Sequence, residues 1–367
     1  MEKTITSFYI VISWICLFSG CSGDGSSLMK SVTGKPGETV VVLEKGFWVG
    51  NVGDTILHYL SQPQLCLPQE EPILNVVNVP PEALKTFETT RNIILTRILP
   101  SITEPSVSVK YNVWARPQVV VIVQAADESA FMKIFAEKSD LIITEILGAE
   151  KKRLMAMYSQ NKFKEQAISD TLIKYHNFNL NIPKGYDIVK DTSNFIWIRY
   201  ESPLTSQGVF AYWYPYDSDS SFVTGKLIHK RDSILRHNVP GSVIGSYMAT
   251  EKRFIIAQTF KHNGNYSVEI RGLWKVEGDF MGGPFVSLST LDLAGKRVLT
   301  VEGYVYSPKY NKRDYLRQVE AMVYSVSLTN QKLNDKINDM YQIGEPFAKD
   351  TSDTSKSSMQ NKSSSRY

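Results

Sequence analysis

The chain has 367 residues, of which 43% are hydrophobic, 21% charged and 11% aromatic. This is the composition of a globular protein, and the length allows one large domain or two of ordinary size. The 41 Lys and Arg residues outnumber the 37 Asp and Glu residues only slightly, and both signs are spread along the chain. Nucleic-acid-binding proteins concentrate their basic residues in one run or on one face, so no nucleic acid is expected as a partner.

The N-terminal segment is typical of a bacterial lipoprotein signal. Lys3 precedes an apolar run from Phe8 to Phe18, which has signal-peptide length and is too short to cross a bilayer as a helix. Ser19-Gly20-Cys21 follows, and it resembles a lipobox. Residues 1–20 are therefore predicted to be a cleaved lipoprotein signal peptide, with acyl chains on Cys21 as a membrane anchor. The alternative is an ordinary secretory signal that happens to contain a cysteine.

Low-complexity segments follow the signal and end the chain. Residues 21–34 are predicted to be a flexible tether, because Gly and Ser dominate their first part. Residues 345–367 are rich in Ser, Lys and Asp and are predicted to be a disordered tail. No other segment has 18 uninterrupted apolar residues, so no spanning helix is expected after the signal.

Cysteine usage excludes a disulfide framework. With Cys16 in the signal and Cys21 acylated, Cys66 is the one cysteine of the three that remains. It stands between Leu65 and Leu67, which favours a buried small hydrophobic residue over a reactive thiol. The protein must therefore be stabilised by its core.

The first half, residues 35–176, is predicted to hold strands followed by helices. Strand-like runs bounded by turn residues lie at 38–43, 73–79, 91–99, 107–114 and 119–123. Asp54 is predicted to cap a short helix. Between Glu128 and about His176, apolar residues recur every three or four positions, which predicts helix. Breaks in this helical stretch are expected at Ser139-Asp140 and around Gln160-Asn161.

The second half, residues 177–330, repeats strands with fewer helices. Strands are predicted at 178–182, 195–200, 210–214, 254–260, 266–276, 285–291 and 298–306. Helices are predicted at 225–237 and 313–326, and Ala294-Gly295-Lys296 indicates a hairpin. Strands in runs with grouped helices predict an α+β fold with antiparallel sheets. Whether the two sequential halves pack as one domain is left open.

The commonest catalytic and metal-binding signatures are missing from the sequence. The chain lacks the nucleophile elbow, the phosphate-binding loop and the dinucleotide fingerprint. Its five histidines show no metal-ligand spacing, and Asp217-Ser218-Asp219 lacks the Gly and Glu that would complete a calcium loop. No catalytic residue, metal ligand or cofactor is therefore predicted.

An aromatic run gives the first candidate binding site. In Tyr212-Trp213-Tyr214-Pro215-Tyr216, the four rings offer flat apolar faces on which a sugar can stack. The candidate binding residues are Tyr212, Trp213, Tyr214 and Tyr216. The alternative is a strand whose alternate rings are buried.

A glycine pair gives the second candidate. Gly282 and Gly283 lie in Asp279-Phe280-Met281-Gly282-Gly283-Pro284-Phe285, predicted to be a tight loop between strands. Glycine adopts backbone angles closed to other residues, which explains a sharp turn and also allows a ligand to approach the backbone. The turn is the favoured interpretation.

Several segments together carry a resemblance to a known family. They are Trp114-Ala115-Arg116-Pro117-Gln118, Ile182-Pro183-Lys184-Gly185-Tyr186, Gly272-Leu273-Trp274 with 279–285, Val301-Glu302-Gly303-Tyr304-Val305-Tyr306 and Lys312-Arg313-Asp314. With the lipobox, they resemble an uncharacterised lipoprotein family, a domain of unknown function of Bacteroidetes-type Gram-negative bacteria. The match covers about 35–328 and is most specific at 272–285. The resemblance implies a cell-envelope location and no catalytic residues.

The leading hypothesis is a lipid-anchored envelope protein, on the outer rather than the inner membrane. It would act as a non-enzymatic binding or assembly module, with an envelope protein or a glycan as partner. The alternative is a lipid-anchored hydrolase of envelope glycan or peptide. That alternative requires a cleft in which residues such as Asp279, Glu302 or His262 converge.

Overall fold

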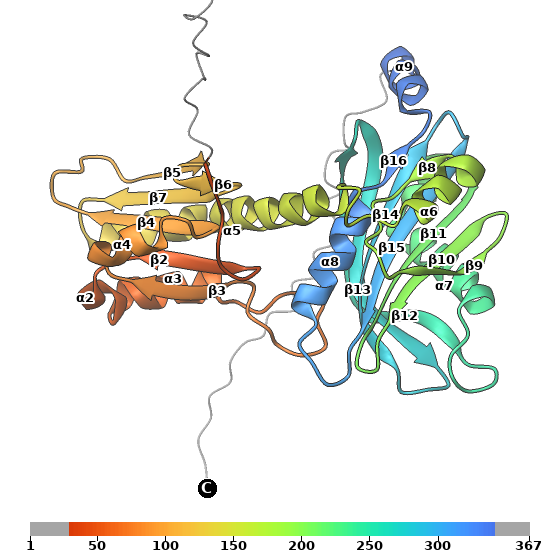
Figure 1. Ribbon diagram of the computed structural model, residues 1–367, viewed down its shortest axis with the longest axis horizontal. Coiled ribbons are helices and arrows are strands. Elements are labelled where there is room, and N and C mark those ends of the chain that lie inside the picture. The colour runs from red at the N-terminus through yellow and green to blue at the C-terminus, as the bar shows by residue number, and fades with distance from the viewer. Residues whose placement is uncertain (1–28, 342–367) are drawn as a thin grey trace, which may run out of the picture.

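The computed structural model describes residues 29–341, which form two lobes connected by a long helix (Figure 1). The predicted signal peptide, Cys21, most of the predicted tether and the predicted tail lie outside the described residues. The boundary between the lobes falls between helix α5 (Glu128–Tyr158) and helix α6 (Gln166–Thr171), whereas the predicted first half extends to residue 176. Each lobe contains its own sheet and hydrophobic core.

The N-terminal lobe is built on a five-stranded sheet in the order β3-β2-β4-β7-β5. Its strands are β2 (Glu38–Val42), β3 (Asn75–Val79), β4 (Asn92–Ile98), β5 (Ser106–Tyr111) and β7 (Val119–Ala125). The first four strands of this order are parallel, and β5 alone is antiparallel to its neighbour. The α+β class is confirmed, but the expected antiparallel pairing is wrong for this lobe.

Crossover connections explain the parallel pairing. Two parallel strands need a connection long enough to bring the chain back to the end of the sheet at which the first strand began. Helix α3 (Asn51–Leu60) connects β2 to β3, and η1 (Pro81–Ala83) with α4 (Leu84–Phe87) connects β3 to β4. Helix α3 begins after Gly50, so Asp54 lies in its first turn and does not cap it. The remaining short elements of this lobe are β1 (Lys30–Ser31), α2 (Lys45–Trp48) and β6 (Ala115–Arg116).

Helix α5 (Glu128–Tyr158) runs unbroken for 31 residues from the first lobe to the second (Figure 1). Asp127 caps its start by accepting a hydrogen bond from the Ala130 amide at 2.8 Å. The expected break at Ser139 is wrong, because its hydroxyl donates back to the Ala136 carbonyl at 2.9 Å and so stays within the helix. The expected break around Gln160-Asn161 is confirmed.

The C-terminal lobe contains the predicted antiparallel sheet, with seven strands in the order β12-β13-β14-β15-β11-β10-β9. The strands are β9 (Asp187–Asp191), β10 (Phe195–Glu201), β11 (Ser206–Pro215), β12 (Tyr247–His262), β13 (Asn265–Glu277), β14 (Gly282–Asp292) and β15 (Arg297–Tyr306). Asp292 pairs with Arg297 across the predicted hairpin. The remaining short elements are η2 (Leu172–His176), β8 (Phe178–Asn179), η3 (Asp219–Phe222), β16 (Ser327–Leu328) and α9 (Gln331–Tyr341).

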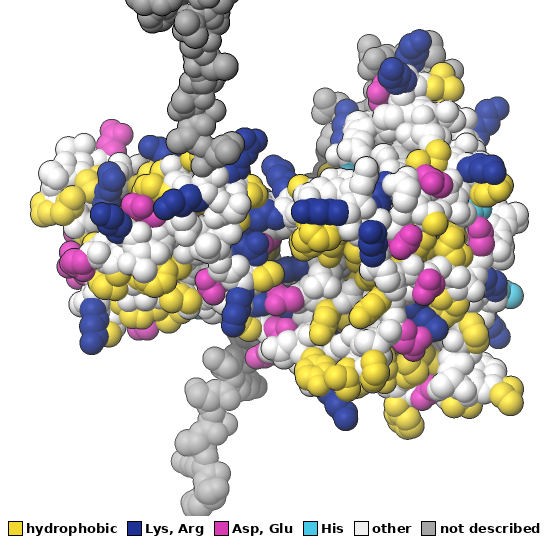
Figure 2. All heavy atoms as spheres, viewed as in Figure 1, with side chains coloured by type: hydrophobic (Ala, Val, Ile, Leu, Met, Phe, Trp, Pro, Cys, Tyr) yellow, Lys and Arg dark blue, Asp and Glu magenta, His cyan; other side chains and the backbone are white. Residues whose placement is uncertain are grey.

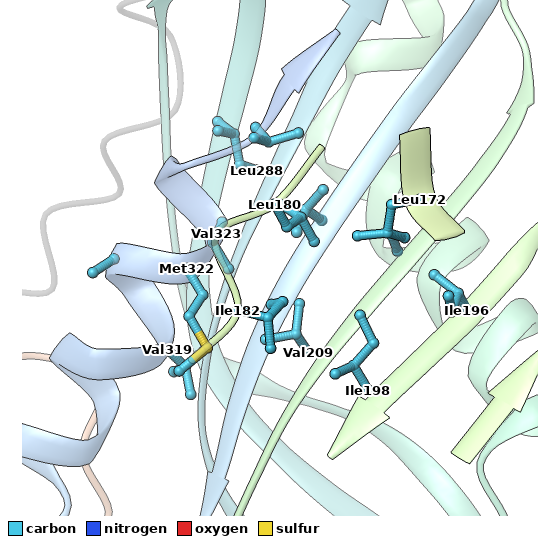
Figure 3. Close-up of a cluster of buried hydrophobic side chains, with 14 of the residues drawn as sticks. Leu172, Leu180, Ile182, Ile196, Ile198, Val209, Leu288, Val319, Met322 and Val323 are labelled. Carbon is cyan, nitrogen blue, oxygen red and sulfur yellow. The ribbon is translucent and has the colours of Figure 1, made fainter. Parts of the chain in front are cut away.

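Helices cover both faces of this sheet. Alternate residues of β10 illustrate the division, because Phe195 belongs to the core under α7 (Thr224–Asn238) and Ile196 to the core under α8 (Arg313–Tyr324). Figure 3 shows the second core, in which aliphatic side chains from the sheet meet Val319 and Val323 of α8. Burying each such side chain contributes about 1.5–3 kcal/mol.

The lobes are joined by polar contacts around the start of α8. The Glu71 carboxylate, only 4% exposed, accepts hydrogen bonds from the amides of Lys312 at 2.6 Å and Arg313 at 3.0 Å. Arg313 also donates to the Pro72 carbonyl at 2.6 Å. Figure 2 shows charged side chains gathered where the two lobes meet.

Candidate functional site

The aromatic run Tyr212–Tyr216 divides its rings between different environments. Successive strand residues point to opposite faces, so Tyr212 is buried in the core beneath α7 while Trp213 packs against the core on the other face. The Trp213 ring lies 5.0 Å from that of His176, and the Arg297 guanidinium lies 5.4 Å from its centroid. The two rings therefore share no stacking surface.

The other two tyrosines of the run have structural partners. Lys230 of α7 lies 4.9 Å from the centroid of the Tyr214 ring, and burial raises the pKa of Tyr214 to about 12. The Tyr216 hydroxyl donates to Asp219 at 2.5 Å. The arrangement matches the alternative interpretation, a strand with alternate rings buried.

Gly282 and Gly283 begin strand β14, so the turn is confined to the residues before them. Neither has a positive φ, and the sharp backbone bend falls instead on Gly278, whose φ is 88°. The two glycines are needed for close approach. A Cβ on Gly282 would lie 2.9 Å from the Trp274 carbonyl oxygen, and one on Gly283 would overlap the Val305 carbonyl oxygen. Gly282 therefore lets the backbone of Trp274 come close, and Gly283 leaves room for the Trp274 indole beside the Val305 carbonyl.

Trp274 is part of a pocket that the aromatic run does not reach. We call it the aromatic pocket, and its volume is about 300 Å³. Strands β10, β13 and β15 supply its rings and a cation, and the β13–β14 turn supplies a methionine. The main lining residues are Trp197, Arg199, Trp274, Met281, Tyr304 and Tyr306.

Hydrogen bonds and ring contacts hold the rings of the aromatic pocket in place. Trp197 Nε1 donates to the Tyr304 hydroxyl at 3.0 Å, and Trp274 Nε1 donates to the Val305 carbonyl at 3.2 Å. The Trp274 and Tyr304 rings meet edge to face at 5.8 Å. Burial raises the pKa of Tyr304, so its hydroxyl stays protonated. The rings are therefore fixed before any ligand arrives.

The mouth of the aromatic pocket is polar. The Arg199 guanidinium lies 5.1 Å from the centroid of the Trp197 ring and forms an ion pair with Glu201 at 2.7 Å. Ser206 and Ser242 add hydroxyl groups to the lining. An apolar cavity with a few polar groups at its rim is the usual form of a small-molecule site.

The three residues that would mark a hydrolase are not brought together. Glu302 is fully buried against Arg231 beneath α7. His262 lies next to the Val326 carbonyl at 3.3 Å, and burial lowers its pKa, so its ring is neutral at pH 7. Asp279, in the β13–β14 turn, accepts a hydrogen bond from the Ser242 hydroxyl. His262 and Asp279 flank opposite ends of the 13-residue strand β13, roughly 40 Å apart at 3.3 Å per residue.

Between residues 29 and 341, no group of three or more His, Cys, Asp and Glu side chains is arranged to hold a metal ion. His229 and His237 lie exposed on α7, and His237 Nδ1 bonds to the Ser233 carbonyl at 2.8 Å. Cys66 is half-buried, and burial raises the pKa of its thiol. A raised pKa disfavours the reactive thiolate, in line with the expected inert role.

No helix of the described residues is long and apolar enough to cross a membrane. No curated protein matches the chain. Among solved structures, the crystal structure of LpqN, described as involved in cell envelope biogenesis of Mycobacterium tuberculosis, is 12% identical and covers 41% of this chain and 83% of its own. The TM-score is 0.26, too low to support an argument about fold or function.

Two family models match the chain, and their boundary coincides with that of the two lobes. Residues 32–159 match the domain of unknown function DUF8532. Residues 165–325 match the domain of unknown function DUF4837. The aromatic pocket lies within the second match, and the first match ends one residue after α5. The chain therefore contains two sequential domains of unknown function, DUF8532 followed by DUF4837.

Proposed function

We propose that the protein is a lipid-anchored, non-enzymatic binding module of the cell envelope and that the aromatic pocket is its ligand site. The observation that supports this proposal is the convergence of four aromatic rings on one cavity. Trp197, Trp274, Tyr304 and Tyr306 come from three strands and line a volume of about 300 Å³. Trp197, Trp274 and Tyr304 are buried, so the apolar surface that they offer a ligand is completed by the half-buried ring of Tyr306.

Glycan is the ligand class that this chemistry favours. The apolar face of a sugar ring packs on an aromatic face, while its hydroxyls need donors and acceptors at the rim. Arg199 offers donors and Glu201 acceptors at the mouth of the pocket. The volume is at the lower end of the range for ligand sites, which suits one sugar ring at the end of a chain.

The anchor in this proposal is the predicted lipidation of Cys21. Acyl chains there would hold the binding domain at the envelope, on the outer rather than the inner membrane. A Cys21→Ala variant is expected to leave the membrane fraction and to keep its glycan binding, since the pocket lies in the second lobe. Retention of this variant in the membrane fraction would contradict the anchor.

Glycan binding is tested with fragments of peptidoglycan and outer-membrane polysaccharide, measured by calorimetry on the full chain. Tyr306→Ala removes a half-buried ring of the pocket and is expected to weaken binding at least tenfold. Tyr216→Ala removes a half-buried tyrosine of the same lobe that lies outside the pocket. This control is expected to bind like the wild type. Equal affinity of the two variants, or no glycan binding by the wild type, would overturn the proposal.

A further inference from the structure

The two edges of the seven-stranded sheet differ in how well they are protected. Strand β9 forms one edge, and three of its five residues, Asp187, Lys190 and Asp191, carry charge. Strand β12 forms the other edge and is 16 residues long. Between Phe254 and Phe260 it has no charged residue, no glycine and no proline. Short length, charges and prolines normally keep an edge strand from pairing with another chain, and this stretch has none of them.

The first part of β12 has its outward backbone groups satisfied within the protein. In an antiparallel pair, alternate residues bond to the partner strand, and the residues between them direct their N–H and C=O groups away from it. The Met248 amide points away from β13 and donates to the Val239 carbonyl at 3.0 Å. The Thr250 amide also points away and donates to the Asp232 carboxylate at 2.9 Å. Helix α7 and the residue that follows it therefore cover this part of the edge.

The second part of β12, residues 254–261, leaves its outward backbone groups unpaired, and we call it the open edge. Thr250 lies opposite Trp274, and after a bulge Ile255 lies opposite Gly272, two residues away on β13. Ile255 therefore points its backbone groups outward, as Thr250 does, and every second residue after it does the same. The outward-facing residues of the open edge are Ile255, Ala257, Thr259 and Lys261. No hydrogen bond from within residues 29–341 reaches their outward N–H or C=O groups.

The side chains of the open edge suit a further strand on both faces. Ile256 and Phe260 share the face towards α8, where the Phe260 ring stacks on that of Tyr324 with centroids 6.0 Å apart. Ile256 is 40% exposed and lines a cavity of about 430 Å³ between the lobes, so there is room on this face. Ala257 and Thr259, on the other face, are small and exposed. An added strand could therefore pack apolar side chains on one face and meet no bulky side chain on the other.

Cations stand at both ends of the open edge. Lys252 and Arg253 precede it and Lys261 ends it, and all three are exposed. Glu251 pairs with Arg253 at 2.9 Å. Lys252 and Lys261 have no ion pair with any residue between 29 and 341. A strand with acidic residues at both ends would therefore match the charge of this surface.

We infer that the open edge binds an extended segment of a partner protein, with apolar residues at alternate positions and acidic residues at both ends. The segment adds a strand to the sheet, and its backbone pairs with the four outward-facing residues, which gives affinity. Its apolar side chains lie beside Ile256 and Phe260, and its acidic ends lie near the exposed lysines, which gives specificity. The site shares no residue with the aromatic pocket, so this inference does not depend on glycan binding.

The test uses the full chain and a labelled synthetic peptide in which valine and threonine alternate between a pair of glutamates at each end. Fluorescence anisotropy is expected to show saturable binding, and the same peptide with lysines in place of the glutamates should bind at least tenfold more weakly. Ala257→Pro removes an outward N–H without removing a bond to β13, and it is expected to weaken binding at least tenfold. Ile256→Glu keeps every backbone group but sets a carboxylate on the apolar face, and it is expected to weaken binding to the same extent.

Ala257→Ser is the matched control, because it changes the same side chain and keeps the outward N–H, and it should bind like the wild type. Tyr306→Ala, in the aromatic pocket, should also bind the peptide normally, which separates this inference from the glycan proposal. Wild-type affinity in a folded Ala257→Pro or Ile256→Glu variant, or no binding of the peptide to the wild type, would overturn the inference. A wild-type dimer in sedimentation that Ala257→Pro abolishes would also overturn it, because the occupant would then be a second copy of the chain.

Discussion

Arg231 of α7 and Glu302 of β15 form a two-pronged ion pair in the core, with N–O distances of 2.7 and 2.6 Å. The side chain of Arg231 is 2% exposed and that of Glu302 is fully buried. The remaining Arg231 nitrogen donates to Thr250 at 2.7 Å, and the guanidinium lies 4.1 Å from the Phe285 ring centroid. The pair fixes α7 on the sheet, and it gives the buried Glu302 carboxylate a structural role.

Removing only one partner of this ion pair should destabilise the protein. Arg231→Met leaves the Glu302 carboxylate buried without a countercharge, and the free energy of unfolding is expected to fall by about 3–5 kcal/mol. The double variant Arg231→Met with Glu302→Leu removes both charges and should recover most of the loss. Urea denaturation of the two variants measures both values. A double variant no more stable than the single one would show that the charges themselves are not the cause.

Acid should destabilise the protein through Glu320. Burial alone raises the pKa of Glu320, but its ion pairs with Arg271 and Lys151 outweigh burial and lower the pKa from 4.5 to about 2. A depressed carboxyl pKa gives stability that is complete above pH 4.5 and is lost as the pH falls from there towards 2. At 1.36 kcal/mol per pKa unit, the contribution is about 3 kcal/mol.

The variant Glu320→Gln should therefore be less stable at pH 7 and decline less steeply between pH 4.5 and 2. Urea midpoints at several pH values in this window provide the measurement. Glu277→Gln is the control, because Glu277 pairs with Lys275 at 2.8 Å but is 44% exposed. It should decline like the wild type, and a decline of the same steepness in Glu320→Gln would refute the assignment.

Glu71 should hold the start of α8 across the lobe boundary. Glu71→Ala removes the acceptor of the Lys312 and Arg313 amides. Loss of a helix cap costs about 0.5–2 kcal/mol. Amide hydrogen exchange in the first turn of α8 is expected to accelerate, with little change at the start of α7. Unchanged exchange at Lys312 and Arg313 would count against this capping role.

Gly283 should not tolerate a methyl group. Gly283→Ala forces a Cβ onto the Val305 carbonyl oxygen, and overpacking of this kind costs about 1–3 kcal/mol. The strain should also displace Trp274 and change its fluorescence, because Trp274 Nε1 donates to the same carbonyl. Gly46→Ala meets no atom within 4 Å and serves as the control. Equal stability of the two variants would show that the strands separate at no cost.

Gly148 should respond in the opposite way. A Cβ there meets no atom within 4 Å, and alanine favours a helix interior over glycine by about 0.5–1 kcal/mol. Gly148→Ala is therefore expected to stabilise the protein and to raise the midpoint of thermal unfolding. A lower midpoint would mean that the space beside Gly148 is less open than the structure indicates.

Local sequence patterns were informative for the second half of the chain. Alternation predicted strands at 266–276, 285–291 and 298–306, and each lies within an observed strand of the antiparallel sheet. The predicted helix at 225–237 corresponds to α7. Three expectations in the first half failed: the antiparallel pairing, the helix break at Ser139 and the helix cap at Asp54. Parallel pairing depends on the connections between strands, and the continuity of α5 at Ser139 depends on a hydroxyl that bonds back to its own helix.

Residue composition pointed to aromatic binding at a segment whose rings the fold sends in different directions. The run from Tyr212 to Tyr216 is conspicuous because its rings are adjacent in sequence, yet adjacency on a strand sends them to opposite faces. Trp197, Trp274 and Tyr304 are separated by many residues and give no local signal. The segments 272–274 and 301–306, which contain Trp274, Tyr304 and Tyr306, were noticed for the family resemblance, which implied no binding site.

The sequence by itself determined the α+β class, most of the strands and helices, and the division into two halves, since these depend on periodicities within a few residues. The tertiary structure decided the strand order, the aromatic pocket and the buried ion pairs. Arg231 and Glu302 are 71 residues apart, and Glu71 and Lys312 are 241 apart. Such contacts depend on how whole elements pack, and no local pattern records them.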